Sequence, residues 1–136
     1  MCIRDSASGD SKSLIWAYTN LGQIQLKNGK EKSAENYFKE SLNLARSIDY
    51  KLEIIHALTE LGKYYNRTKN YREAEINLKE ALKLAEEINS LTNLSILNQE
   101  LAALYYNTGT YKKAYELKII YKKQSKKIYD IANKKK

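Results

Sequence analysis

The chain has 136 residues, enough for one domain, with 43% hydrophobic and 29% charged residues, a balance typical of a folded protein. No run approaches the roughly 18 consecutive apolar residues of a membrane span, so we expect none in this chain. Proline is absent and only five glycines occur, which favours a nearly all-helical fold because both residue types interrupt helices. The single cysteine, Cys2, excludes an internal disulfide and a thiolate zinc cluster.

The net charge of +8 is concentrated at one end of the chain. Residues 1–110 contain 14 basic and 14 acidic side chains, whereas residues 111–136 contain ten lysines against Glu116 and Asp130. The excess positive charge therefore lies in the last predicted helix and its tail.

Residues 1–10 match no later part of the sequence. The opening string MCIRDS resembles a translated sequencing adaptor of the kind found at the ends of metagenome-derived proteins. We therefore expect residues 1–10 to be a disordered, non-native leader, and the chain to be a fragment of a longer protein. The absence of a secretory signal favours a cytoplasmic location.

From residue 12 onward the sequence repeats itself at a period of 40. Three sets of residues align at this spacing: Leu21, Leu61 and Leu101; Ala34, Ala74 and Ala114; Ile48, Ile88 and Ile128. A fixed period of this length predicts a stack of structural repeats. We place the repeats at about 12–50, 51–90 and 91–131, which gives a repeat domain over 11–132 and a basic tail over 133–136.

Each repeat divides at a turn into two helical patterns. In the second half of the first repeat, small and apolar residues recur at three- and four-residue steps and form one stripe on a helix: Ala34, Phe38, Ser41, Leu42, Ala45 and Ile48. Turn residues recur at 28–30, 68–70 and 107–109. We predict six helices, at about 12–27, 31–47, 51–67, 71–88, 91–107 and 111–131.

Small residues mark the points where the two helices of a repeat cross. Gly22 and Gly62 leave the first helix bare, which lets its axis approach the second helix closely. The third repeat departs from this pattern, because it has Ala102 in place of glycine and places Lys118 and Tyr121 where leucine and alanine are expected. We expect it to act as a cap with a polar outer face.

These residues resemble the tetratricopeptide repeat, in a long variant of about 40 residues. The second repeat carries the motif most fully, with Leu61, Gly62, Tyr65, Ala74, Leu78 and Ala81. The resemblance covers roughly residues 12–130. It implies an all-α, right-handed α-solenoid of three helix-turn-helix repeats, made of six antiparallel helices. It also implies that the first helices of the repeats line a concave groove that holds a partner protein or peptide.

Carrying over the family's groove positions gives a partner-binding set that mixes aromatic, amide and cationic side chains: Trp16, Thr19, Gln23, Lys27, His56, Thr59, Lys63, Asn66, Arg67, Gln99, Tyr106 and Asn107. Lys27, Lys63 and Arg67 suit an acidic ligand. The alternative for the same positions is an ordinary solvated helix face.

The tyrosine pairs offer a second set of expectations. Adjacent helical residues point about 100° apart, so we expect Tyr65 and Tyr105 in the core and their neighbours Tyr64 and Tyr106 exposed. In the last helix we expect the tyrosines on the apolar side and the lysines on the wet side.

No set of residues predicts catalysis. His56 is the only histidine and has no partner at a readable spacing, so we expect no catalytic site, metal or cofactor. We expect a protein-interaction module, similar to the sensory part of bacterial signalling proteins. The alternative is binding of nucleic acid or another anionic surface by the lysine-rich last helix.

Overall fold

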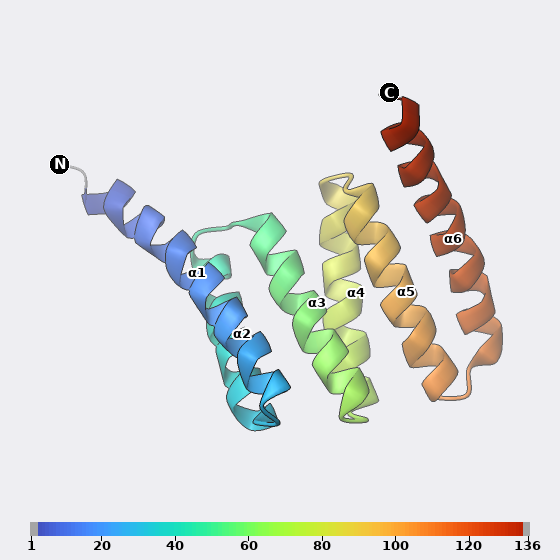
Figure 1. Ribbon diagram of the computed structural model, residues 1–136, viewed down its shortest axis with the longest axis horizontal. Coiled ribbons are helices and arrows are strands. Elements are labelled where there is room, and N and C mark those ends of the chain that lie inside the picture. Colours follow the sequence, from blue (N-terminus) through green and yellow to red (C-terminus); the bar gives the residue numbers. More distant parts are fainter. Residues whose placement is uncertain (1–2, 135–136) are drawn as a thin grey trace. The chain divides into compact units, whose positions relative to one another are not determined.

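A computed structural model describes the backbone of residues 3–134 and the side chains of residues 11–134. Within this range it contains six helices and no strand (Figure 1). Four predicted helices agree with the structure to within one residue at each end. The helices are α1 (Ile3–Lys27), α2 (Glu31–Ser47), α3 (Lys51–Arg67), α4 (Tyr71–Glu87), α5 (Leu91–Asn107) and α6 (Tyr111–Lys134).

The two terminal helices differ from the prediction. Helix α1 begins at Ile3, so residues 3–10 have a helical backbone where a disordered leader is expected. The segment contains no proline, and one glycine does not stop a helix that residues 12–27 already nucleate. Helix α6 likewise continues to Lys134, into the expected tail. Residues 1–2, including Cys2, and residues 135–136 lie outside the described part of the chain.

One turn geometry recurs every 20 residues and ends each of the helices α1 to α5. After α1, the Lys30 amide donates to the Gln25 carbonyl at 2.8 Å and the Gly29 amide donates to the Leu26 carbonyl at 3.1 Å. This is the Schellman arrangement, which needs a left-handed residue, and Gly29 supplies it with a φ of 77°. The same bonds and positive φ values recur at Asp49, Lys69, Asn89 and Gly109. The 40-residue period is therefore two such helix-turn units.

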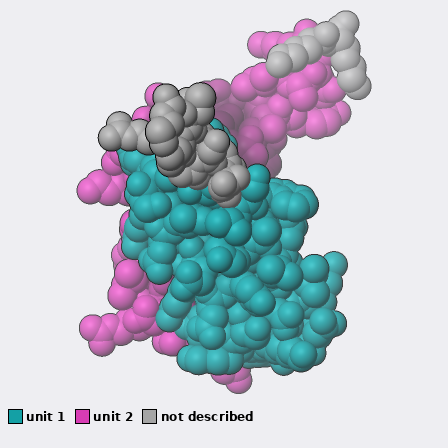
Figure 2. All heavy atoms as spheres, turned by 90° about the vertical axis from the view of Figure 1, so that its left-hand side faces the viewer, with its two compact units in different colours: residues 1–61 teal, residues 62–136 magenta. Residues whose placement is uncertain are grey.

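The chain forms two compact units, Met1–Leu61 and Gly62–Lys136, coloured separately in Figure 2. In the first unit, α1 packs on α2, and the small and apolar stripe of α2 is buried from Ala34 to Ala45, while Ile48 is half-buried. A methyl group on Gly22 would lie 2.6 Å from Cε1 of Phe38, so the Phe38 ring fills the space above the glycine. Ser41 also bonds Thr19 through their hydroxyl oxygens, 2.9 Å apart. The predicted close crossing is present here.

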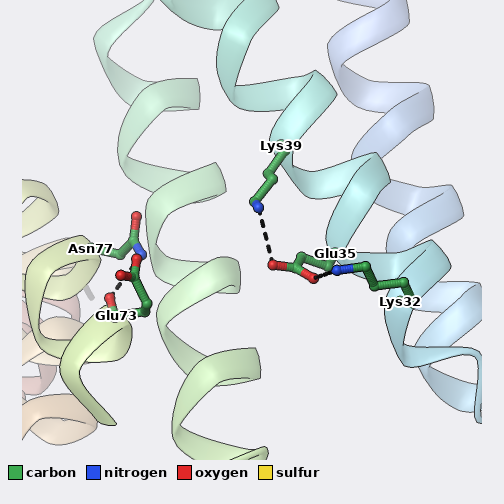
Figure 3. A network of polar contacts seen from close by, with 5 residues as sticks. All are labelled: Lys32, Glu35, Lys39, Glu73 and Asn77. Carbon is green, nitrogen blue, oxygen red and sulfur yellow. Dashed lines mark hydrogen bonds and ion pairs between the residues drawn. The ribbon is translucent and has the colours of Figure 1, made fainter. Parts of the chain in front are cut away.

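A buried carboxylate lies on the same helix of the first unit. Glu35 bridges Lys32, at 3.3 Å, and Lys39, at 3.1 Å, on neighbouring turns of α2 (Figure 3). Both lysines are exposed, while Glu35 is buried. The carboxylate is thus compensated from its own helix. Figure 3 also shows Asn77, whose amide donates to the Glu73 carbonyl at 2.8 Å on α4.

The second unit contains the end of α3 together with α4, α5 and α6. Leu78 covers Gly62 as Phe38 covers Gly22, because a methyl group on Gly62 would lie 2.5 Å from its side chain. Helix α5 packs on α4 and on α6, and α5 and α6 run antiparallel (Figure 1). The hydroxyls of Ser95 and Ser125, 3.1 Å apart, add a polar contact between α5 and α6.

The tyrosine pairs follow the expectation in one case only. Tyr105 is buried and Tyr106 is exposed, as expected. Tyr64 and Tyr65 are both buried, so the expectation of an exposed Tyr64 is wrong. Helix α3 buries adjacent residues elsewhere too, such as Ile54 with Ile55. A helix covered on more than one side hides neighbours that point 100° apart.

Candidate partner-binding site

Two of the predicted groove residues are part of the core. Thr19 and Thr59 are both buried, and their hydroxyls donate to the carbonyls of Ile15, at 2.9 Å, and Ile55, at 2.7 Å, on their own helices. Neither side chain is available to a partner, and this part of the prediction is wrong. Threonine suits such a site because its hydroxyl can bond the preceding turn of the helix.

The other predicted residues of the first unit are accessible. Trp16 is 71% exposed, and Lys27 and His56 are also exposed. Gln23 is half-buried, and its amide donates to a Glu60 carboxylate oxygen at 3.1 Å. Glu60 was not among the predicted residues, although its place one residue after Thr59 puts it beside the predicted positions of α3. The first helices of the unit, α1 and α3, are thus joined by a polar contact on this side.

In the second unit the structure brings the predicted residues of two helices together. The Asn107 amide donates to the Asn66 side-chain oxygen at 3.0 Å, which joins the ends of α5 and α3. Arg67 and Lys63 are exposed on α3, as is Gln99 on α5. Tyr106 is 65% exposed on α5. We call the six residues Lys63, Asn66, Arg67, Gln99, Tyr106 and Asn107 the inner face of the second unit.

A hollow between α5 and α6 was not predicted from the sequence. It has a volume of about 480 Å³, and its lining consists of four tyrosines, three alanines, a glutamine and a lysine: Gln99, Ala102, Ala103, Tyr106, Tyr111, Ala114, Tyr115, Lys118 and Tyr121. We call it the tyrosine groove. It exists because Lys118 stands where Leu78 and Phe38 stand in the earlier repeats, and the exposed lysine does not fill the space. The sequence feature that could have predicted the groove is the departure of the third repeat from the pattern at Ala102, Lys118 and Tyr121.

The surroundings of α6 also correct the expectation for its tyrosines. Tyr111, Tyr115 and Tyr129 are all more than 60% exposed, so they do not lie on a packed apolar side. Among the described residues of α6, only Ala114 is buried. Tyr106 and Tyr111 contact each other edge to face, with ring centroids 5.4 Å apart.

A charged cluster joins α4 to α5 on the second unit. The Tyr105 hydroxyl donates to Glu75 at 2.6 Å, and Lys79 pairs with the same carboxylate at 3.1 Å. The hydrogen bond from Tyr105 and the charge of Lys79 hold the pKa of Glu75 below its usual value, although partial burial acts in the opposite direction. Burial, followed by the bond to Glu75, raises the pKa of Tyr105, and the same carboxylate raises the pKa of Lys79. The cluster is a structural link between the two helices.

The described residues offer no set of three or more histidine, cysteine or carboxylate side chains that would hold a metal ion. None of the helices in residues 3–134 has the length and apolar character needed to cross a membrane.

Comparisons with known proteins identify the family. The tetratricopeptide repeat model matches residues 13–87, more than half of the chain. The chain belongs to the tetratricopeptide repeat family, and it has the all-α solenoid fold of that family. Tetratricopeptide repeats generally mediate protein–protein interaction and are not catalytic.

Solved structures agree with this fold. The TPR domain of Arabidopsis FLU is 23% identical with a TM-score of 0.80, and the alignment covers 86% of this chain and 98% of that one. BtubC (BKLC) from P. vanneervenii is 21% identical with a TM-score of 0.79, over 85% of this chain and 48% of that one. The chain thus spans about half the length of BtubC. No curated protein matches the sequence.

Proposed function

We propose that the chain binds a partner protein or peptide through the inner face of the second unit. The observation that carries the proposal is the hydrogen bond between Asn66 and Asn107, which links the ends of α3 and α5 on the inner face. This surface presents Arg67 and Lys63 as exposed cations and Tyr106 as an exposed aromatic ring. Aromatic and arginine side chains are the commonest anchors of protein interfaces.

The character of the surface favours an acidic segment of the partner. The six residues of the inner face include two cations and no carboxylate. A carboxylate of the ligand would form charge-assisted bonds with both cations. A peptide backbone would find donors and acceptors in the amides of Asn66, Gln99 and Asn107.

The test is a pull-down, in which the full chain is immobilised and partner proteins are recovered on it from an extract of the cells that express it. The variant Lys63→Glu with Arg67→Glu reverses the charge of the inner face and should lose the partner. The matched control, Lys30→Glu with Lys83→Glu, makes the same change in net charge at exposed positions outside the inner face and should retain it. Equal recovery by both variants would sink the proposal, provided that circular dichroism shows both to be folded.

A narrower proposal is that the module serves as the sensory region of a bacterial signalling protein in the cytoplasm. It is supported by the 40-residue period and by the long basic helix α6. The full-length gene tests it: an in-frame histidine kinase or DNA-binding domain is expected, and a secretory signal would contradict it.

A further inference from the structure

Helix α6 repeats the pattern of α4 but leaves open the face that α4 buries. On α4, the positions that are buried follow one stripe: Ala74, Leu78, Ala81 and Ala85. The period of 40 places Ala114, Lys118, Tyr121 and Ser125 at the same positions of α6. Lys118 and Ser125 are exposed and Tyr121 is half-buried, so Ala114 alone keeps its burial.

Two helices lie against α4 in the second unit, because Leu78 covers Gly62 of α3 and α5 packs beside it at Glu75. Helix α5 packs on α4, and Tyr105 of α5 reaches Glu75 of α4 with its hydroxyl. Repeats of one sequence pattern stack in one way, because the small and large positions that fit together recur. On α6, α5 takes the place that α3 has on α4, and no described helix takes the place of α5, so the tyrosine groove is open to a further helix. Its floor of Ala102, Ala103 and Ala114 allows the close approach of a second backbone.

The polar groups on this face are reversed between α4 and α6. Where α4 offers the carboxylate of Glu75 as an acceptor, α6 has Tyr115, which is 67% exposed. One turn further on, Lys118 replaces a leucine, and Lys122 follows at a spacing of four residues. A helix that docks on α6 thus meets hydroxyl and ammonium donors and must supply the acceptors.

The net charge of α6 also favours a partner helix that supplies carboxylates. The segment Tyr111–Lys134 carries eight lysines against Glu116 and Asp130. Helix α5, the helix that docks on α4, contains no basic residue and one glutamate. The helix that fits α6 has the same apolar stripe and more carboxylates.

We propose that the tyrosine groove is a docking site for an acidic amphipathic helix of a partner protein. The apolar stripe of that helix lies on the alanines and tyrosines of the groove, and its carboxylates face Lys118 and Lys122. This inference extends the proposed function, because it adds to the interaction module a surface that adjoins the inner face and shares Gln99 and Tyr106 with it. A single-stranded nucleic acid is less well matched, since the rings of Tyr106 and Tyr111 pack edge to face and do not form a stacking platform.

The test uses a labelled helical peptide of about 20 residues, which spans about 30 Å, with leucine at i, i+3, i+4 and i+7 positions and glutamate elsewhere. Fluorescence anisotropy measures its binding to the full chain at physiological salt. We expect saturable binding that weakens about tenfold or more in the variant Lys118→Glu with Lys122→Glu, because charge reversal replaces attraction by repulsion. The matched variant Lys112→Glu with Lys127→Glu, which changes exposed lysines on other faces of α6, should bind nearly as well as the unchanged chain.

Three further probes decide between occupants. A peptide of the same composition with a scrambled order lacks the apolar stripe, and equal binding would reduce the site to non-specific charge attraction. A peptide with lysine in place of every glutamate should not bind to the chain. A single-stranded oligonucleotide that displaces the acidic peptide and binds more tightly would assign the groove to nucleic acid instead. A dimer of the free chain that dissociates when the peptide is added would assign the groove to a second copy of the chain. No detectable binding of the acidic peptide would overturn the proposal.

The two binding surfaces fail separately. Lys63→Glu with Arg67→Glu should leave the affinity for the acidic peptide unchanged, because neither residue lines the tyrosine groove. If that variant loses the cellular partner and still binds the peptide, the cations of the inner face and the groove hold different ligands, although the two surfaces share Gln99 and Tyr106.

Discussion

Two glycines determine how closely the helices of a repeat approach. Gly62 is buried under Leu78, and a methyl group in its place would lie 2.5 Å from two carbons of that leucine. Non-bonded carbon atoms do not approach each other this closely, so the methyl group of an alanine would push the leucine or the helix away. Alanine normally stabilises a helix relative to glycine by about 1 kcal/mol. At this position packing and helix propensity have opposite signs.

We expect Gly62→Ala to lower the free energy of unfolding by about 1 kcal/mol or more, because overpacking a core costs about 1–3 kcal/mol. Thermal or urea unfolding measures the change. Leu78→Ala should cost about 2–5 kcal/mol by itself, since the side chain is fully buried.

The double variant is the control for this prediction. In the background of Leu78→Ala, the change Gly62→Ala should become neutral or stabilising, because the cavity receives the added methyl group. A Gly62→Ala protein that melts higher than the unchanged chain would show that the two helices do not meet as described.

Glu75 makes stability depend on pH. Its pKa is lowered in the folded state, so the ionised carboxylate strengthens folding. This contribution is fully present above the ordinary value of 4.5 and is lost as the pH falls through the lowered pKa. We expect Glu75→Gln to reduce stability at neutral pH and to matter less and less below pH 4.5, as urea unfolding at several pH values will show.

Glu73→Gln is the comparison for this measurement, because Glu73 is exposed on the same helix. If both substitutions give the same pH profile, the bond between Tyr105 and Glu75 does not contribute to stability.

At the scale of an element, α6 is the least supported helix of the second unit. Beyond Ser125 no described residue of α6 is buried, and the last side-chain bonds to α5 are those of Ser125 with Ser95 and of Gln124 with Asn98. Lysines at four-residue spacing, such as Lys118 with Lys122, also repel each other along the helix. The lack of burial favours opening at this end, where the ion pair of Lys126 with Asp130 is a side-chain contact along the helix.

We therefore expect backbone amides of residues 126–134 to exchange with deuterium faster than those of α4. Hydrogen exchange followed by mass spectrometry measures both segments in one experiment, and α4 serves as the internal reference. Equal protection in the two helices would mean that α6 is held by contacts other than those to α5.

At the scale of the whole molecule, the charge distribution keeps the alternative function open to measurement. The net charge is +8, and the described lysines of α6 are exposed. A lysine-rich helix attracts any polyanion, but attraction that rests on charge alone weakens steeply as salt rises.

We expect a single-stranded oligonucleotide to bind at low salt and to be released at about 0.2 M salt, because few phosphates can reach the lysines of one helix. Binding at increasing salt, followed by anisotropy, tests this. Tight binding that persists at 0.2 M salt and is abolished by neutralising the lysines of residues 111–134 would favour nucleic acid as the biological ligand.

The sequence by itself determined the period, the six helices, the turns and the family. These features are local: apolar residues at three- and four-residue steps make a helix amphipathic, and a glycine recurring in the first helix of a repeat predicts a close crossing. Gly22 and Gly62 therefore predicted a close crossing, and the structure added that Phe38 and Leu78 are the side chains that cover them.

Only the tertiary structure decided which surfaces are free. Thr19 and Thr59 occupy family groove positions but are buried, Tyr64 is hidden together with Tyr65, and Tyr115 is exposed. Burial depends on how many neighbours a helix has, which periodicity along one chain does not encode. The tyrosine groove has the same origin. Helix α4 lies against both α3 and α5, whereas α6 lies against α5, and this difference leaves the groove open.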